Sequence, residues 1–95
     1  MDKYHITEKN IPAHEWNGLQ AVVQTTAGKK QSWAGTIVWE TKNTIELETG
    51  SGVKKIPKKI ARITFDWDGK KMVLEAKDWI ARPEDRVKLW WRKNA

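Results

Sequence analysis

The stretch that decides the fold is residues 33–48, which read WAGTIVWETKNTIELE. Residues 33–40 have the composition of a strand, and Thr41-Lys42-Asn43 has the composition of a tight connection. Beyond it, Ile45 and Leu47 alternate with polar residues, which is typical of a strand with one face in solvent. The stretch therefore predicts two consecutive antiparallel strands.

The same alternation continues on both sides of this stretch. Further strand-like segments begin at Leu19, Val53, Ile63 and Met72. Gly50-Ser51-Gly52 and Asp68-Gly69 are turn signals between them. Six short strands without a long crossover predict an antiparallel meander. Because closure removes exposed edges in a chain this small, we expect an all-β fold with a six-stranded antiparallel barrel.

Both ends of the chain have a different character from the predicted barrel at 19–81. The N-terminal arm, residues 1–18, contains a predicted short helix from Ile11 to Trp16. The C-terminal segment, residues 82–95, is predicted to be a helix from Pro83 to about Arg92, because proline suits a first turn, acids follow it and bases end the segment. With 95 residues and 11.0 kDa, we expect one domain spanning 1–95.

The composition excludes several classes of protein. There is no cysteine, so disulfides, thiolate metal sites and cysteine nucleophiles are ruled out. His5 and His14 lack the spacing of a metal site, and neither a nucleophile elbow nor a phosphate-binding glycine loop occurs. We therefore expect no catalytic residue and no metal site. No signal-peptide or membrane-span pattern occurs, so a cytoplasmic protein with no membrane partner is expected.

Positive charge is concentrated in two windows of a chain whose formal net charge is +6. The first window, residues 54–62, holds five bases and no acid: Lys54, Lys55, Lys58, Lys59 and Arg62. The second, residues 82–95, holds five bases against two acids, and its bases are Arg82, Arg86, Lys88, Arg92 and Lys93. Such asymmetry favours a phosphate-binding face over lysines that are merely solvated.

Tryptophan is unusually frequent, with seven residues against one Phe and one Tyr. Trp67 is in phase with Ile63 and Phe65, which predicts a core position. Trp90 and Trp91 are adjacent on a predicted helix and cannot both pack on one surface. One of them is a candidate contact for a protein or an RNA base, and a frayed tail is the alternative.

Two segments, residues 35–48 and Arg82-Pro83-Glu84-Asp85-Arg86, carry a family resemblance together with others described below. In matching order and spacing, these segments resemble archaeal ribonuclease P protein component 1, the archaeal counterpart of the eukaryotic twenty-nine-kilodalton subunit. Residues 35–48 resemble the family's signature, and residues 82–86 are similar to its C-terminal signature. Val53-Lys54-Lys55-Ile56-Pro57-Lys58 is similar to its basic strand. Ile6-Thr7-Glu8-Lys9-Asn10, His14-Glu15 and Gly18-Leu19 match its arm and first strand, so the resemblance runs from about Ile6 to Val87.

The resemblance implies an Sm-like barrel and the role of a protein subunit of ribonuclease P, which removes the 5′ leader of precursor tRNA. It implies three partners: the ribonuclease P RNA, a small zinc-binding protein subunit and, indirectly, precursor tRNA. Catalysis in such a complex belongs to the RNA and its metal ions, expected to be Mg²⁺, so this chain would bind no cofactor. The alternative is a generic basic Sm-like barrel that binds DNA or acts as a protein adaptor.

The resemblance also implies site residues. It places RNA-facing positions at Lys42, Lys54, Lys55, Lys58, Arg82 and Arg86. The charge windows add Lys59, Arg62, Lys88 and Arg92. A protein partner is expected to contact the arm at Ile11 and Trp16 and the strand around Ile37 and Trp39. Trp39 has two possible orientations: toward solvent or a partner, or into the core with Gly35 and Ile37.

Overall fold

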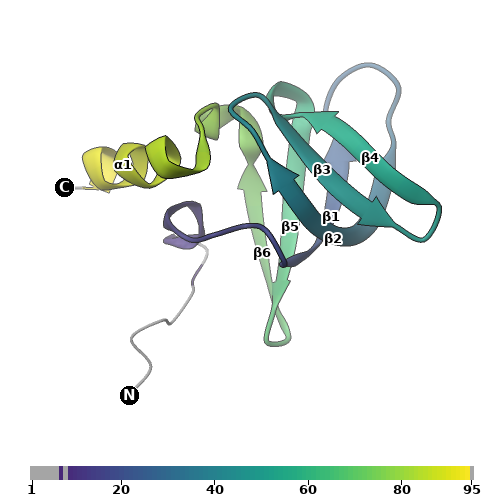
Figure 1. Cartoon of the computed structure of the whole chain (residues 1–95), viewed down its shortest axis with the longest axis horizontal. Coiled ribbons are helices and arrows are strands. Elements are labelled where there is room, and N and C mark those ends of the chain that lie inside the picture. Colours follow the sequence, from purple (N-terminus) through teal and green to yellow (C-terminus); the bar gives the residue numbers. More distant parts are fainter. Residues whose placement is uncertain (1–6, 8, 95) are drawn as a thin grey trace.

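The computed structural model describes residues 7 and 9–94, which form strands, short 3-10 helices and one α-helix (Figure 1). The six strands are β1 Gln20–Thr25, β2 Ser32–Glu40, β3 Thr44–Thr49, β4 Gly52–Pro57, β5 Ala61–Trp67 and β6 Lys70–Glu75. The 3-10 helices are η1 Ile11–Ala13, η2 Lys58–Ile60 and η3 Ala76–Trp79. The α-helix is α1, Pro83–Asn94. The predicted strands and C-terminal helix are thereby confirmed.

The strands form one curled antiparallel sheet in the order β4-β3-β2-β1-β5-β6. Its edge strands β4 and β6 are not paired with each other, so the prediction of a closed barrel was wrong. The reason lies in the helical turns that come after the edge strands. β4 ends at Pro57 and continues into η2, β6 continues into η3, and these two turns pack against each other. The edges are thus bridged at one end by helical turns, which offer no strand ladder.

The concave face of the sheet holds a single apolar core. Its inward residues alternate along the regular strands, as in Ala61, Ile63 and Phe65 of β5. Burying a side chain the size of Ile63 or Phe65 contributes roughly 1.5–3 kcal/mol, before the cost of ordering the chain. Trp67 is not part of this core, because it lies at the β5–β6 hairpin and is 38% exposed.

A β-bulge in β2 decides which side chains enter the core. Ile37 is opposite Leu47, and Glu40 is opposite Ile45, so one extra residue lies between the two paired positions. The bulge inverts the alternation after Ile37. As a result Trp39 points outward and is 55% exposed, while Glu40 points inward and is 4% exposed. This settles the orientation of Trp39 that the sequence left open.

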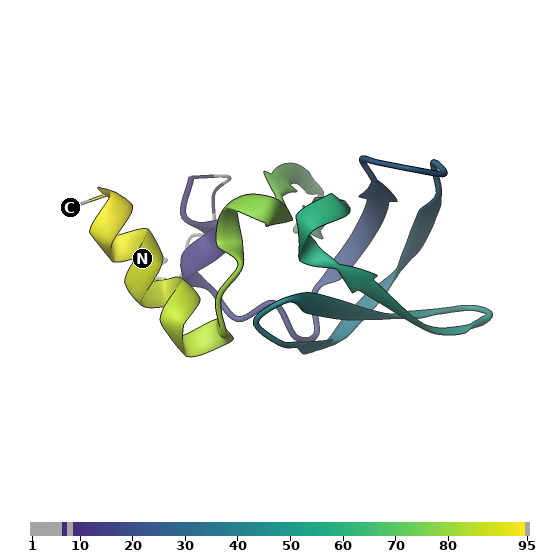
Figure 2. The same ribbon diagram turned by 90° about the horizontal axis from the view of Figure 1, so that it is seen from above.

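The N-terminal arm is less helical than predicted. Among residues 7 and 9–18, only η1 is helical, and His14 is already extended, with φ −107° and ψ 161°. The carbonyls of Pro12 and His14, which a longer helix would use internally, accept hydrogen bonds from the Arg86 side chain instead. η1 packs against α1 at one end of the sheet, as Figure 2 shows from above. Within the described residues, no helix is long and apolar enough to span a membrane.

Gly35 marks a close approach of β2 to β3, and we expect Gly35→Ala to destabilise the fold. A β-carbon there would lie 2.0 Å from the carbonyl oxygen of Glu48, a backbone atom that can move only with its strand. We expect the free energy of unfolding, measured by urea titration, to decrease by about 1–3 kcal/mol or more. Gly50→Ala is the control, because a β-carbon at Gly50 meets no atom within 4 Å. Equal stability of the two variants would contradict this packing.

Candidate nucleic-acid interface

The polar centre of the molecule is a buried ionic network of Glu40, Lys58 and Arg86. Glu40 Oε2 accepts hydrogen bonds from Lys58 Nζ and Arg86 Nε, both at 2.8 Å. Glu40 Oε1 accepts a third from Arg86 Nη2, also at 2.8 Å. All three side chains are at most 4% exposed. Because they come from β2, η2 and α1, the network joins three separate parts of the chain.

One carboxylate faces two cations, and backbone carbonyls supply the remaining stabilisation. Lys58 Nζ donates to the carbonyls of Trp79 and Ala81, at 3.2 and 2.8 Å. Arg86 Nη1 donates to the carbonyls of Pro12 and His14. Buried charges are tolerated when their donors are satisfied in this way. The network therefore fixes the arm and the η3–α1 connection as well as the three elements that carry its side chains.

The Trp16 ring packs beside this network. The guanidinium carbon of Arg86 lies 3.9 Å from the centroid of its ring, within the range of a cation–π contact. Lys58 Nζ lies 5.4 Å from the same ring. Phe65 packs against it with a centroid separation of 5.5 Å. The indole N–H donates to the carbonyl of Ile11, so the buried ring has no unsatisfied polar group.

Burial shifts the pKa of two groups in this region. Desolvation lowers the pKa of Lys58 below 10.5, and Arg86 adds to the lowering, while the hydrogen bond and charge of Glu40 oppose it. Desolvation also lowers the pKa of His14 below 6.5, and the positive charge of Arg86 acts in the same direction. Glu40 is therefore the group that makes a protonated Lys58 tolerable inside the fold.

The burial corrects the site predictions at five positions. Lys58 and Arg86 are enclosed and paired with Glu40, so the prediction that they contact RNA directly was wrong. Ile11, Trp16 and Ile37, expected at a protein interface, are each 0% exposed and belong to the core. Sequence patterns could not separate them, because the burial arises from contacts between distant segments.

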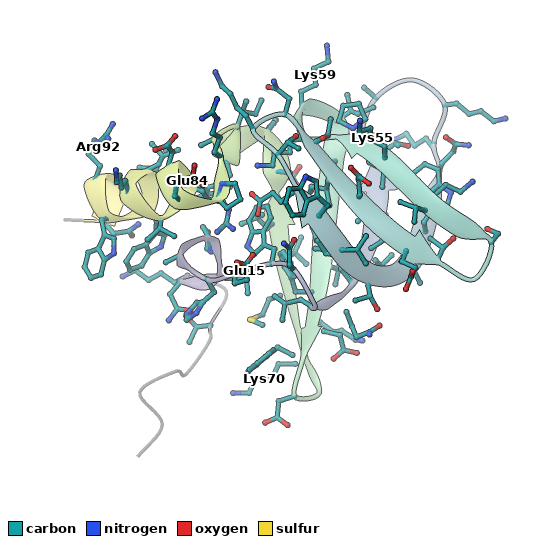
Figure 3. The ribbon with its side chains drawn as sticks, viewed as in Figure 1. Glu15, Lys55, Lys59, Lys70, Glu84 and Arg92 are labelled. Carbon is teal, nitrogen blue, oxygen red and sulfur yellow. The ribbon has the colours of Figure 1, made fainter. Side chains whose placement is uncertain are left out.

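The exposed bases that remain gather around η2. Lys42 precedes Asn43, whose carbonyl accepts a hydrogen bond from the backbone N–H of Lys58 at 2.7 Å. Arg82 follows Ala81, whose carbonyl accepts a hydrogen bond from Lys58 Nζ. We call this surface the basic edge, and its exposed members are Lys42, Lys55, Lys59, Arg62 and Arg82. In Figure 3, Lys55 and Lys59 lie on the upper side of the sheet, and Lys70 lies at its opposite end.

The β1–β2 loop extends the basic edge with residues that sequence reasoning missed. It is tied to η2 by a hydrogen bond from the Thr26 N–H to the Ile60 carbonyl, at 2.8 Å. Between this loop and β5 lies a hollow of about 360 Å³ with a polar lining that includes Lys30 and Arg62. The sequence signal that could have identified this loop as part of the basic edge is Gly28-Lys29-Lys30, a basic pair next to a glycine.

The other predicted bases have different surroundings. Lys54 is half-buried and lies on the opposite face of β4 from Lys55. Lys88 and Arg92 are exposed on α1, away from the sheet. Arg62 is partly neutralised, because its Nε lies 2.5 Å from Glu75 Oε2 at the surface. The basic edge therefore combines lysines with an arginine whose orientation an ion pair fixes.

Within residues 7 and 9–94, no group of three or more His, Asp or Glu side chains is placed to hold a metal ion. The buried carboxylate of Glu40 is fully engaged with Lys58 and Arg86. The arrangement is suited to presenting fixed positive charge to a polyanion.

Comparisons with known proteins identify the family of this chain. The family model "Ribonuclease P/MRP, subunit p29" matches residues 9–89. The chain is 39% identical over 90 residues to "Ribonuclease P protein component 1" of Methanosphaera stadtmanae, covering 93% of this chain and 97% of that protein. It is 34% identical over 90 residues to the protein of the same name from Pyrococcus furiosus, covering 93% and 71%. The chain therefore belongs to the ribonuclease P/MRP subunit p29 family.

Proposed function

We propose that this chain is an RNA-binding, non-catalytic protein subunit of ribonuclease P that supports the RNA in removing the 5′ leader of precursor tRNA. The observation that carries the proposal is the basic edge, whose exposed bases are arranged around the buried Lys58. Membership of the p29 family supplies the complex in which that surface acts. Catalysis and Mg²⁺ binding are assigned to the RNA.

The physical basis for RNA binding is counterion release. Each lysine or arginine that neutralises a phosphate releases condensed cations, so affinity falls as salt rises. The basic edge is well suited to this, because Lys55 and Arg62 lie in strands of the sheet. Its other bases lie in η2 or next to residues hydrogen-bonded to Lys58. Ordered segments of this kind lose little conformational entropy on binding. Arg62 and Arg82 can contact a phosphate through two N–H groups, whereas the lysines act as point charges.

The proposed protein partner is the small zinc-binding subunit, and its contact is proposed around Trp39. This ring is the only one of the four expected partner residues that is exposed. The bulge that turns it outward places it opposite Glu46 of β3, which is in turn opposite Lys55 of β4. An exposed indole with flanking charges is typical of an interface anchor.

Two other expectations remain proposals. The open curled sheet is proposed as a variant of the Sm-like barrel. The cytoplasmic location of the chain stays a prediction.

The test is the salt dependence of RNA binding by the Lys55→Ala/Lys59→Ala double variant. We expect weaker binding to the ribonuclease P RNA and a shallower slope of log affinity against log salt, by about 0.7–0.9 for each phosphate that is no longer neutralised. Lys70→Ala is the matched control, because it removes an exposed lysine from the β5–β6 hairpin at the other end of the sheet.

Three outcomes are informative. A shallower slope in the double variant alone, with slower 5′ cleavage of precursor tRNA by the reconstituted complex, supports the proposal. Identical slopes in the double variant, Lys70→Ala and the unmodified chain would remove the basic edge from the interface. Tight binding to duplex DNA without any effect on precursor tRNA cleavage would favour the alternative of a DNA-binding barrel.

A further inference from the structure

The most exposed large apolar side chain in the described part of the molecule is Trp91 on α1. It is 62% exposed, although it lies next to Trp90, which is only half-exposed. Trp90 packs toward the arm, and its indole N–H donates to the carbonyl of Lys9 at 2.8 Å. The two rings meet edge to face with centroids 5.0 Å apart. Trp90 thus packs beside the Trp91 ring, most of which stays exposed.

The helix that carries Trp91 is fixed to the protein. Arg86, little more than one turn before Trp91, is held in the buried network by Glu40. Further along, Lys93 Nζ lies 5.6 Å from the Trp79 ring centroid. These contacts hold α1 on both sides of Trp91. A ligand would therefore meet an aromatic surface that is already ordered, which lowers the entropic cost of binding.

The neighbours of Trp91 are positively charged. Lys88 precedes it by three positions, so the two side chains lie on the same face of the helix. Arg92 is the next residue, and both bases are exposed. In Figure 3, Arg92 projects from α1 toward solvent. A partner protein that buried Trp91 would have to desolvate these cations, whereas a nucleotide offers a ring for the indole and a phosphate for the bases.

We propose that Trp91, Lys88 and Arg92 form a stacking site for an unpaired RNA nucleobase and its adjoining phosphate. This proposal rests on the proposed function, because it adds a second contact to an RNA already bound at the basic edge. Trp91 and Arg92 lie beyond residues 9–89, which the family model matches. The site is therefore assigned from this chain's own helix.

The experiment compares Trp91→Ala, Trp91→Phe and Trp67→Ala in the full chain. Trp67→Ala is the matched control, because its indole is also exposed but lies at the β5–β6 hairpin, outside the proposed binding surfaces. The probes are a single-stranded RNA of mixed sequence and the same strand with abasic positions. We expect Trp91→Ala to weaken binding to the normal strand by about 5- to 150-fold, with a smaller decrease for Trp91→Phe and none for Trp67→Ala.

Two further measurements distinguish stacking from other causes. The salt slope of Trp91→Ala should equal that of the unmodified chain, because no charge is removed. Abasic positions should weaken binding by the unmodified chain but not by Trp91→Ala.

Unchanged RNA affinity of Trp91→Ala would overturn the stacking site, and so would a defect confined to capture of the protein subunits. Neither result would affect the proposed function, which fails if the unmodified chain does not bind the RNA or has no effect on precursor tRNA cleavage.

Discussion

Replacing Glu40 by alanine is expected to lower the free energy of unfolding by about 3–5 kcal/mol, a large part of the stability of a small domain. The substitution leaves Lys58 and Arg86 buried without a counter-charge and removes three hydrogen bonds at 2.8 Å. Both cations remain held by backbone carbonyls and cannot reach water without opening the fold. In thermal unfolding, the expected decrease in Tm is roughly 12–40 °C.

The matched control is Glu48→Ala, which removes an exposed carboxylate from the neighbouring strand β3. An exposed charge of this kind is worth about 1 kcal/mol or less, so its Tm should change little. Glu40→Gln keeps the size of the side chain and removes its charge, and we expect it to be destabilised as well. If Glu40→Ala were as stable as Glu48→Ala, the buried network would not be the feature that joins β2, η2 and α1.

The second large effect is expected from Arg86→Ala, with Arg82→Ala as its matched variant. Arg86 donates to both oxygens of Glu40 and to the carbonyls of Pro12 and His14, and its guanidinium lies against the Trp16 ring. Its removal should cost about 3–5 kcal/mol, because it breaks a buried ion pair. The amide hydrogens of α1 should also exchange faster, since the helix loses its attachment through the buried network.

Arg82→Ala should behave in the opposite way. Arg82 is exposed at the basic edge, so its removal should change stability by no more than about 0.5 kcal/mol. It should instead reduce the salt slope of RNA binding by about 1. Arg86→Ala, measured under conditions where it is folded, should keep the slope of the unmodified chain. Were Arg86→Ala to change the slope while leaving Tm intact, the structural role given to Arg86 would be wrong.

These pairs of neighbouring bases mark the limit of prediction from the charge pattern. Lys58 and Lys59 are adjacent in one basic window, yet the first is buried and the second is exposed. Arg82 and Arg86 belong to one short motif and differ in the same way. A run of like charges predicts that a polyanion-binding surface exists. It does not indicate which members turn inward, because that depends on the position of a buried carboxylate.

The inward orientation of the Glu40 carboxylate could not be predicted from the sequence pattern either. Simple alternation through Gly35 and Ile37 would place Trp39 in the core and Glu40 in solvent. The bulge between Ile37 and Trp39 exchanges the two. A bulge is specified by how β2 pairs with β3 and not by the residues of β2 alone. The burial of Trp16 could not be predicted from local sequence either. It depends on the Arg86 guanidinium and the Phe65 ring, which both pack against the indole.

The sequence by itself determined the secondary-structure elements, because these depend on residues close together in the chain. Period-two alternation placed the six strands, Asp68-Gly69 marked the β5–β6 hairpin, and Pro83 with the charges after it defined α1. Only the tertiary structure decided that the sheet stays open and that Glu40, Lys58 and Arg86 meet inside it. Lys58 and Arg86 lie 18 and 46 positions from Glu40. Charged side chains are buried where distant segments bring their partners together. A local sequence pattern does not predict such a long-range contact.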